Sequence, residues 1–582
     1  MDLKDLRKRL SPKPLDVNST INGSRPQNTP SILSLSFFAA NITKTFSALL
    51  IILPVFVIFS FIHRNPDHHF RNISPFADAR VLEDNPQFSS SFDSHGRNIS
   101  TKEAVKVPEA KLLGGLLSSG FDDAYCLSRY QSYTYRKASS FKPSSYLLSK
   151  LRKYEALHSQ CGPGTKPYND ALKQLKSRSP TASPTECKYV VWMAFSGLGN
   201  RILTIAAAFL YSLLSNRVLL VDPGTDMTDL FCEPFPSASW FLPRDFPLYN
   251  QFTGFNQKSP KCHGFMLKNK YLNASVDSVP PYLYLHLGHD YNDHDKLFFC
   301  DDDQSLLSKV PWLIMKTDNY FVPSLYLIPL FEQELYNLFP QKVTIFHHLG
   351  RYLFHPTNQV WGLITRYYNA YLARADERVG IQIRTFEDGP GPYQHVKDQI
   401  QSCVKREKLL PEINKDHSLI PSSKAEKSVA VLTTSLTSGY YETLRDLYWE
   451  YPTVNGENVG FYQPSHEEHQ QSQKKTHNRK AWAEMYLLSL TDKLVTSAWS
   501  TFGYVAQGLG ELRPWILYKP EDQKTPDPPC VRAMSIEPCF HAPPFWDCKA
   551  KTGIDTGKVV PHVRHCEDIS WGLKVVDENQ EL

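Results

Sequence analysis

Hydrophobic and polar positions follow two different periods along the chain, and this predicts strands interleaved with helices. An apolar run at 188–195 precedes a glycine-containing turn at 196–199, a helical period at 200–214 and another apolar run at 217–222. Short apolar runs bounded by turn residues are typical of buried strands, whereas apolar residues three and four apart indicate a helix. We therefore expect a strand, turn, helix and strand in this order.

A second region of the same kind fills the C-terminal half. Strands are predicted at 378–384, 428–434, 493–497 and 514–519, and helices at 439–449, 478–490 and from near Ser500. A separate helix is expected at 145–161, ending before Gly162. Strands that alternate with helices imply parallel sheets. We predict an α/β protein with two Rossmann-like lobes and a ligand site at the carboxyl ends of the strands.

The N-terminal part lacks these periods but contains one long apolar run. Residues 46–62 carry no charge, and as a helix they would span about 25 Å, enough for a thin bilayer. Lys and Arg are more frequent before the run than after it, so the positive-inside rule puts residues 1–45 in the cytosol. We expect an uncleaved single-pass anchor rather than a signal peptide.

Composition then divides the remaining chain. Residues 63–119 are rich in Ser, Asn, Asp and Pro, which predicts a stem, with order beginning near Gly120. The two lobes are expected at 120–375 and 376–582. The polar segment 465–480 is interpreted as a loop.

Cysteines and charge narrow the class of protein. All 11 cysteines follow the predicted anchor, where an oxidising compartment would pair most of them and leave an odd one. Sequons at Asn72, Asn98 and Asn273 lie on the same side and predict glycosylation. The net charge is only +5, without a basic stripe, which argues against nucleic acid as a partner.

The turn FSGLGNR has the features of an anion site. Gly197 and Gly199 permit a tight turn and close approach of a ligand, and the helix that starts at Asn200 offers free N–H groups. Arg201 beside this helix start suits a diphosphate. A structural turn without a ligand is the alternative.

An NAD-binding fingerprint is the competing interpretation of the same turn. Asp222 lies 23 residues after Gly199, where such a unit has its ribose-binding acid. The third glycine is missing, however, and Ile202 stands in its place. An NAD-dependent oxidoreductase would also have a cytosolic active site, which the predicted anchor contradicts.

Two later motifs also end strands with polar groups. In GIQIRTFED, Arg384 stands at a strand end, where the choice is between a ligand and a surface ion pair. In TSAWSTFG, a strand runs into hydroxyls and small residues at a helix start, which predicts an anion site rather than ordinary capping alone. The residues concerned are Ser500, Thr501, Phe502 and Gly503.

Acidic residues offer two further candidates. Asp301 and Asp303 form an Asp-x-Asp pattern that could hold a divalent metal, but three consecutive acids in a loop are usually solvated charge, and no metal site is expected. Asp318 follows an apolar run and could act as a general base. A cap for the following turn is the structural alternative.

Five phrases in combination resemble the plant xyloglucan fucosyltransferase family. They are FSGLGNR, DLFCEPFP, MKTDNYFVPSL, GIQIR and SAWSTFGYVAQGLG, and the similarity covers roughly Tyr125 to the C-terminus. The resemblance implies a variant of the two-lobed GT-B glycosyltransferase fold. It also implies a Golgi type II membrane enzyme that transfers L-fucose from GDP-fucose, with inversion and without a metal, to O-2 of a galactose.

The resemblance carries roles onto particular residues. Arg384 matches the donor-binding arginine, although Thr385 stands where related fucosyltransferases commonly have a second arginine. Asp318 matches the aspartate considered as a base. The diphosphate of GDP-fucose is then the anion, met by Arg384 and residues 500–503, with Asn200 and Arg201 helping.

Acceptor and partners stay open at this point. Xyloglucan is the leading acceptor and arabinogalactan the runner-up, and an inactive lumenal carbohydrate-binding homologue is the non-enzyme alternative. Expected partners are GDP-fucose, a galactose-containing polysaccharide and the membrane through one helix. Homodimers or complexes with other Golgi glycosyltransferases are left open.

Overall fold

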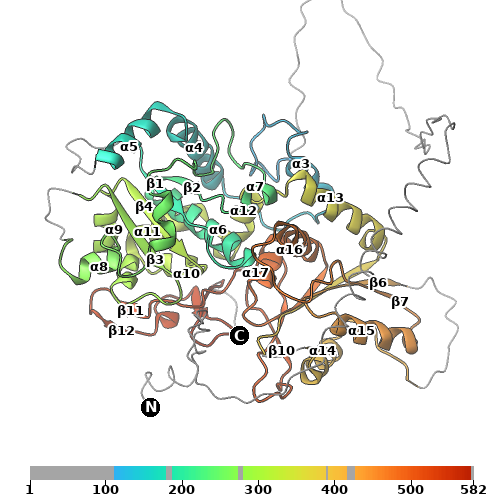
Figure 1. The fold of residues 1–582 in the computed structure, drawn as a ribbon. Helices are drawn as coiled ribbons and strands as arrows, with labels where there is room; N and C mark the ends of the chain where they lie inside the picture. Colours follow the sequence, from blue (N-terminus) through green and yellow to red (C-terminus); the bar gives the residue numbers. More distant parts are fainter. Residues whose placement is uncertain (1–109, 178–185, 273–278, 388–390, 416–426, 578–582) are drawn as a thin grey trace, which may run out of the picture. The chain divides into compact units, whose positions relative to one another are not determined.

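The computed structural model describes residues 110–177, 186–272, 279–387, 391–415 and 427–577, and these form a mixed α/β fold with two largely parallel sheets (Figure 1). This confirms the predicted class. The expected cytosolic tail, the anchor, most of the stem and the three sequons lie outside the described residues.

The first sheet has four parallel strands with apolar side chains on both faces. In spatial order they are β2 (Val218–Val221), β1 (Tyr189–Trp192), β4 (Trp312–Thr317) and β3 (Tyr282–Leu287). Helices α4 (Ser145–Cys161), α5 (Lys166–Ser177) and α6 (Leu198–Ser215) belong to this part of the chain. Continuous apolar strands are typical of a parallel sheet that is covered on both faces.

The second sheet has six strands, and only its edge strand β10 runs antiparallel. The order is β10 (Cys530–Arg532), β9 (Trp515–Leu517), β8 (Lys493–Ser497), β5 (Glu377–Ile383), β6 (Ser428–Ser435) and β7 (Asn458–Tyr462). Helices α14 (Gln394–Arg406) and α15 (Gly439–Glu450) supply apolar side chains to its outer face.

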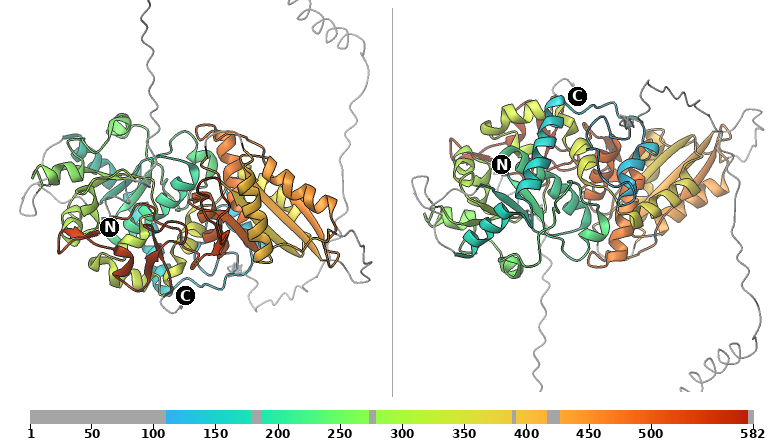
Figure 2. Two further views of the ribbon diagram at one scale, coloured as in Figure 1. Left: turned by 90° about the horizontal axis from the view of Figure 1, so that it is seen from below. Right: turned by 90° about the horizontal axis from the view of Figure 1, so that it is seen from above.

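A layer of helices joins the two sheets through one continuous apolar core. It contains α6, α12 (Ile345–Leu353), α13 (Asn358–Tyr367), α16 (Lys475–Leu488) and α17 (Thr501–Gly510). Figure 2 shows the green residues of the first sheet region and the orange residues of the second on opposite sides in both views. The layer brings the starts of α6 and α17 together.

Shorter elements complete the described part. The helices are α3 (Leu127–Gln131), α7 (Met227–Leu230), α8 (His263–Lys268), α9 (Asp301–Leu307), α10 (Val322–Leu325) and α11 (Pro329–Leu338). The C-terminal extension forms two small antiparallel pairs, β11 (Trp546–Asp547) with β12 (Thr552–Gly553) and β13 (Val563–His565) with β14 (Leu573–Val575).

Disulfides link α14 to strand β10 and the C-terminal extension to the start of α9. The five bonds are Cys126–Cys232, Cys161–Cys187, Cys300–Cys548, Cys403–Cys530 and Cys539–Cys566. Cys262 is free and buried. The expectation of mostly paired cysteines with one left over is confirmed.

Three boundaries differ from the sequence-based expectation. Residues 475–480 are helical, so the polar segment is not a loop throughout, and the three acids begin helix α9 rather than lying in a loop. Leu116 and Leu117 are buried in the core, so order begins before Gly120. Acidic residues in the first turn favour a helix because they face the positive end of its dipole, which accounts for α9.

One described helix is long and apolar enough to cross a membrane. It is α6, but 83% of its most apolar window is buried inside the protein. Its hydrophobicity is explained by its place between the two sheets, as expected for a core helix that is apolar all round.

Candidate functional site

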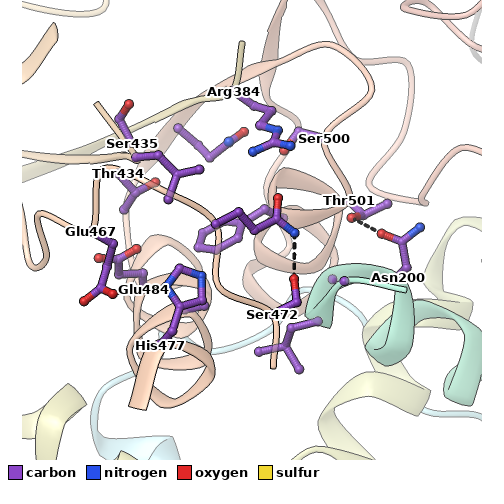
Figure 3. A pocket seen from close by; sticks show the side chains of 18 of the residues that line it. Asn200, Arg384, Thr434, Ser435, Glu467, Ser472, His477, Glu484, Ser500 and Thr501 are labelled. Atoms are coloured by element: carbon purple, nitrogen blue, oxygen red, sulfur yellow. Dashed lines mark hydrogen bonds and ion pairs between the residues drawn. The ribbon is translucent and has the colours of Figure 1, made fainter. Parts of the chain in front are cut away.

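A cavity of about 390 Å³ opens where strand ends of the second sheet meet the starts of α6 and α17 (Figure 3). Its walls combine segments far apart in the sequence. They are residues 196–200 before and within α6, 382–384 at the end of β5, 434–436 at the end of β6, parts of the segment 465–484 and residues 499–502 before and within α17. The position agrees with the rule that ligands bind at the carboxyl ends of parallel strands.

Two helix N-termini face this cavity. Gly197 is the N-cap of α6, and Ser500 is the N-cap of α17 and accepts a hydrogen bond from the Gly503 amide. The Thr501 hydroxyl donates to the Asn200 side-chain oxygen at 2.9 Å, which links the two helix starts (Figure 3). Free N–H groups and the positive ends of two helix dipoles favour an anion here.

Two glycines make this close approach possible. A Cβ on Gly199 would lie 2.6 Å from the Thr501 hydroxyl oxygen, and one on Gly503 would lie 1.9 Å from that of Thr496. The second glycine of FSGLGNR therefore also accommodates the neighbouring helix. Gly197 and Gly199 both line the cavity.

Arg384 brings a positive charge into the cavity. Its amide donates to the Ser497 hydroxyl at 2.9 Å, and its guanidinium lies 5.3 Å from the centre of the Phe386 ring. Burial lowers the pKa of Arg384. Within the described ranges no ion pair is found for this guanidinium, which points into the cavity (Figure 3). A half-buried cation without a carboxylate partner is suited to bind an anion.

The opposite end of the cavity carries carboxylates. Glu484 of α16 is 8% exposed and accepts a hydrogen bond from the Ser465 hydroxyl at 2.5 Å. Burial raises the pKa of Glu484 to about 7. Glu467, by contrast, pairs with Lys480 and with His477 at 3.2 Å. Glu484 is thus the acidic group here that is free of a paired cation among the described residues.

Arg201 lies beneath the turn and does not line the cavity. It is 5% exposed, and its guanidinium forms a bidentate ion pair with Asp226 at 2.7 and 3.2 Å. The side-chain Nδ2 of Asn478 donates to the same carboxylate at 2.5 Å. This buried group connects α6 with α16, so its evident contribution is to position the two walls.

Asp318 directly follows β4 and is not among the residues that line the cavity. Its carboxylate accepts from the amide and the ring Nδ1 of His289, at 2.9 and 2.5 Å, and from the Asn319 side chain at 2.6 Å. Its backbone carbonyl oxygen accepts from the side-chain Nδ2 of Asn200 at 2.9 Å. Asp318 is therefore one residue removed from the groups that line the cavity.

A second polar network approaches from the C-terminal extension. His541 lines the cavity, and its Nε2 lies 3.1 Å from the Tyr504 hydroxyl. That hydroxyl donates to Asp568 at 2.5 Å, and the same carboxylate oxygen accepts from the Trp499 amide. Burial lowers the pKa of His541, which favours the neutral imidazole.

Comparison with known proteins gives a consistent result. The model of the family described as xyloglucan fucosyltransferase matches residues 88–549. A galactoside 2-alpha-L-fucosyltransferase of Arabidopsis thaliana is 59% identical over 583 residues, covering 99% of this chain and 100% of the relative. One of Pisum sativum is 66% identical over 475 residues, 82% of this chain and 84% of that protein. The chain belongs to the xyloglucan fucosyltransferase family.

A solved structure agrees with this assignment. A point mutant of Arabidopsis thaliana FUT1 in complex with GDP has a TM-score of 0.76 and 66% identity, covering 80% of this chain and 100% of that one. The predicted family and the predicted enzyme class, a fucosyltransferase, are confirmed. Membership decides against the NAD-dependent oxidoreductase. In agreement, the Asp222 carboxylate accepts from the Ala194 and Gly224 amides and thereby holds its own turn.

For this fucosyltransferase, the sequence correctly predicted some of the residues that line the cavity but did not indicate others. Gly197, Gly199, Asn200, Arg384, Ser500, Thr501 and Phe502 line one cavity as grouped; Gly503 lies next to it as the donor to the Ser500 cap. The missed residues come from the strand ends, the polar segment, helix α16 and the extension, and they include Gln382, Thr434, Ser435, Ser465, Glu467, Gln470, His477, Asn478, Glu484 and His541. The unusual density of amides, histidines and acids before an apolar helix was the available signal.

Proposed function

We propose that this chain is a galactoside 2-α-L-fucosyltransferase, which transfers L-fucose from GDP-fucose to O-2 of a galactose on a cell-wall polysaccharide, with inversion. The observation that carries the proposal is the Arg384 guanidinium, which has no ion-pair partner among the described residues and lines one cavity together with the starts of α6 and α17. The names of the two relatives and the GDP in the FUT1 structure support it.

The diphosphate is assigned to the cationic end. In a direct displacement the acceptor oxygen forms a bond to the anomeric carbon of fucose while the bond from this carbon to the phosphate oxygen breaks. The electron pair leaves with GDP, and negative charge grows on its diphosphate. Arg384 and the N–H groups of Thr501 and Phe502 lie where they would stabilise that charge, and such prepositioned donors are usually the largest catalytic contribution.

The base of the nucleotide is assigned to the acidic end. The edge of guanine presents a ring N–H and an amino group, both of which are donors. Glu484 offers two acceptor oxygens in a buried position and is held by Ser465. Uracil and cytosine lack this pair of donors, so Glu484 would select GDP over pyrimidine nucleotides. Asn200 supports the diphosphate site through Thr501.

Domains and location follow from the same assignment. Residues 120–375 would form the acceptor lobe and residues 376–582 the GDP-fucose lobe with its disulfide-linked extension, in a variant GT-B arrangement. The five disulfides and the predicted anchor at 46–62 support a single-pass type II protein with a lumenal catalytic part in the Golgi. No metal or other cofactor is part of the proposal.

A transfer assay with the full-length chain in detergent tests the proposed function. GDP-fucose is supplied with xyloglucan, with arabinogalactan, or with no acceptor, and the linkage of the product is determined. Fucose on O-2 of galactose in xyloglucan supports the proposal, and transfer only to arabinogalactan replaces the acceptor. Binding of polysaccharide with GDP-fucose left intact would instead identify an inactive carbohydrate-binding homologue.

A further inference from the structure

The carboxylate of Asp318 is already occupied by donors of the protein itself. Oδ1 accepts from the His289 amide and the Asn319 side chain, and Oδ2 accepts from the His289 ring. Its side chain is only 9% exposed. A base must have a free lone pair within hydrogen-bond reach of the proton that it removes. These contacts leave Asp318 poorly placed for direct proton transfer.

His289 has the opposite properties. Its side chain is 69% exposed, and its Nδ1 lies 2.5 Å from Asp318 Oδ2. A carboxylate at Nδ1 fixes the tautomer with the proton on Nδ1 and leaves the lone pair of Nε2 open. Among the described residues no hydrogen bond or ion pair to this Nε2 is found. The imidazole therefore presents a fixed, accessible proton acceptor.

The pair lies close to the donor cavity. Asp318 follows β4 and His289 follows β3, so both stand at the carboxyl edge of the first sheet, next to the turn that starts α6. The side-chain Nδ2 of Asn200 donates to the backbone carbonyl of Asp318, and the side-chain Oδ1 of Asn200 accepts from the Thr501 hydroxyl. Asn200 and Thr501 both line the cavity. One residue thus separates the histidine–aspartate pair from the proposed diphosphate site.

We infer that His289 accepts the proton of the attacking acceptor hydroxyl and that Asp318 is a positioning residue that acts through it. This inference rests on the proposed function. The galactose O-2 proton moves to His289 Nε2 as the new bond to the anomeric carbon forms and GDP leaves with its electron pair. Asp318 stabilises the resulting imidazolium, which then releases the proton to water.

The charged surroundings of His289 are compatible with this role. Asp318 faces it from the end of β4 and is the main cause that raises the pKa of His289. Asp290 of the same loop adds a smaller contribution, and it is itself bound to His286 of β3 at 2.9 Å. From the extension, His541 is close enough to Asp318 for the negative charge of this carboxylate to raise the pKa of His541, against the larger effect of burial. The raised pKa makes the protonated, inactive form persist to a higher pH.

The experiment compares wild type, His289→Ala and Asp318→Asn in the full-length chain. Turnover of His289→Ala should fall in the ~10²–10⁴-fold range of general-base catalysis while the GDP-fucose KM changes little. Added imidazole should restore at least part of it, since the exposed site leaves room for the free base. In wild type, kcat should fall below the raised pKa of His289. In Asp318→Asn this limb should move to lower pH, because the carboxylate that stabilises the imidazolium is gone.

His294→Ala is the matched control, because His294 lies in the same segment and its imidazole has no carboxylate partner among the described residues. Its turnover should equal that of wild type and should not change when imidazole is added. The inference is overturned if His289→Ala transfers fucose within a few-fold of wild type. It is also overturned if imidazole restores none of the turnover that His289→Ala loses and the acidic limb of kcat in Asp318→Asn stays where it is in wild type. Absence of transfer by wild type would overturn the proposed function itself.

Discussion

At the scale of single residues, Arg384 has the most direct consequence for turnover. Its guanidinium is half-buried and faces the cavity, and no carboxylate partner is found for it in the part of the chain that the structure describes. Arg384→Ala should reduce kcat by at least the ~10²–10³-fold seen when one such donor is removed, and GDP affinity should fall as well. Arg384→Lys should recover little, because an ammonium cannot form the planar bidentate contact. Turnover, GDP binding and Tm are measured on the same proteins.

Arg445→Ala serves as the control for this series. Arg445 is an exposed arginine of α15 that pairs with its neighbour Asp446, away from the cavity lining. Its removal should leave turnover unchanged. Normal transfer by Arg384→Ala, or a large fall in Tm that accounts for the lost activity, would show that Arg384 has no role at the donor site.

Glu484 leads to a prediction about pH and base selectivity. Burial raises its pKa to about 7, and two guanine donors require the ionised form. GDP affinity should therefore fall as the pH drops through about 7, since binding must then release a proton. Glu484→Gln should lose this dependence and discriminate less between GDP and UDP. Taking the ratio of wild-type and variant Kd at each pH cancels the titration of the phosphates.

The choice of Gln keeps the size of the side chain and its contact with Ser465. Glu467→Gln is the comparison, since Glu467 also lines the cavity but is paired with Lys480 and His477. It should retain the preference for GDP. An unchanged pH profile and an unchanged GDP-to-UDP ratio in Glu484→Gln would remove Glu484 from the base site.

At the scale of elements, the site depends on how closely the starts of α6 and α17 approach each other. Within a helix, Gly→Ala usually stabilises by up to about 1 kcal/mol. At Gly199 the new Cβ would lie 2.6 Å from the Thr501 hydroxyl and 2.9 Å from its carbonyl carbon, so the helix starts must separate. Gly199→Ala should instead lower stability by about 1–3 kcal/mol, as overpacking does, and weaken GDP binding.

Gly254→Ala is the matched control for this change, because nothing lies within 4 Å of a Cβ at Gly254. In thermal unfolding and GDP titration, this variant should have the same Tm and the same GDP affinity as wild type. If Gly199→Ala were as stable as Gly254→Ala and bound GDP normally, the contact between the two helix starts would have no bearing on the site.

The burial of each strand also explains whether it could be predicted from the sequence. The strands β1, β2, β5, β6 and β8 are short apolar runs buried on both faces, so local pattern was sufficient to find them. Strand β7 is partly exposed and was missed. The partner of Arg201 lies 25 residues away at Asp226, and local pattern cannot reveal that the two meet. From the sequence alone, His477 and Glu484 would be interpreted as solvated polar residues, whereas in the folded protein both line the cavity.

At the scale of the whole molecule, the extension after the second sheet contributes to the site through both covalent bonds and hydrogen bonds. Cys300–Cys548 connects it to the segment before α9, and Asp568 holds the Trp499 backbone next to the N-cap of α17. Cys539 and Cys566 form a disulfide beside Asp568, so this group offers no thiolates to a metal. The acids of α9 are engaged as well: Asp303 lies 3.0 Å from His263, and Asp301 accepts from the Leu330 amide.

These positions lead to a prediction about metal dependence. Because Arg384 and two helix starts supply positive charge at the proposed diphosphate site, charge on the leaving GDP can be stabilised by the protein. Treatment with EDTA should leave most of the fucose transfer intact. The double variant Asp301→Asn with Asp303→Asn, which keeps oxygen acceptors for Leu330 and His263 but removes the charges, should also remain active. Transfer that EDTA abolishes and manganese restores, most of all if the double variant is equally inactive, would mean that a bound cation does the work assigned to Arg384.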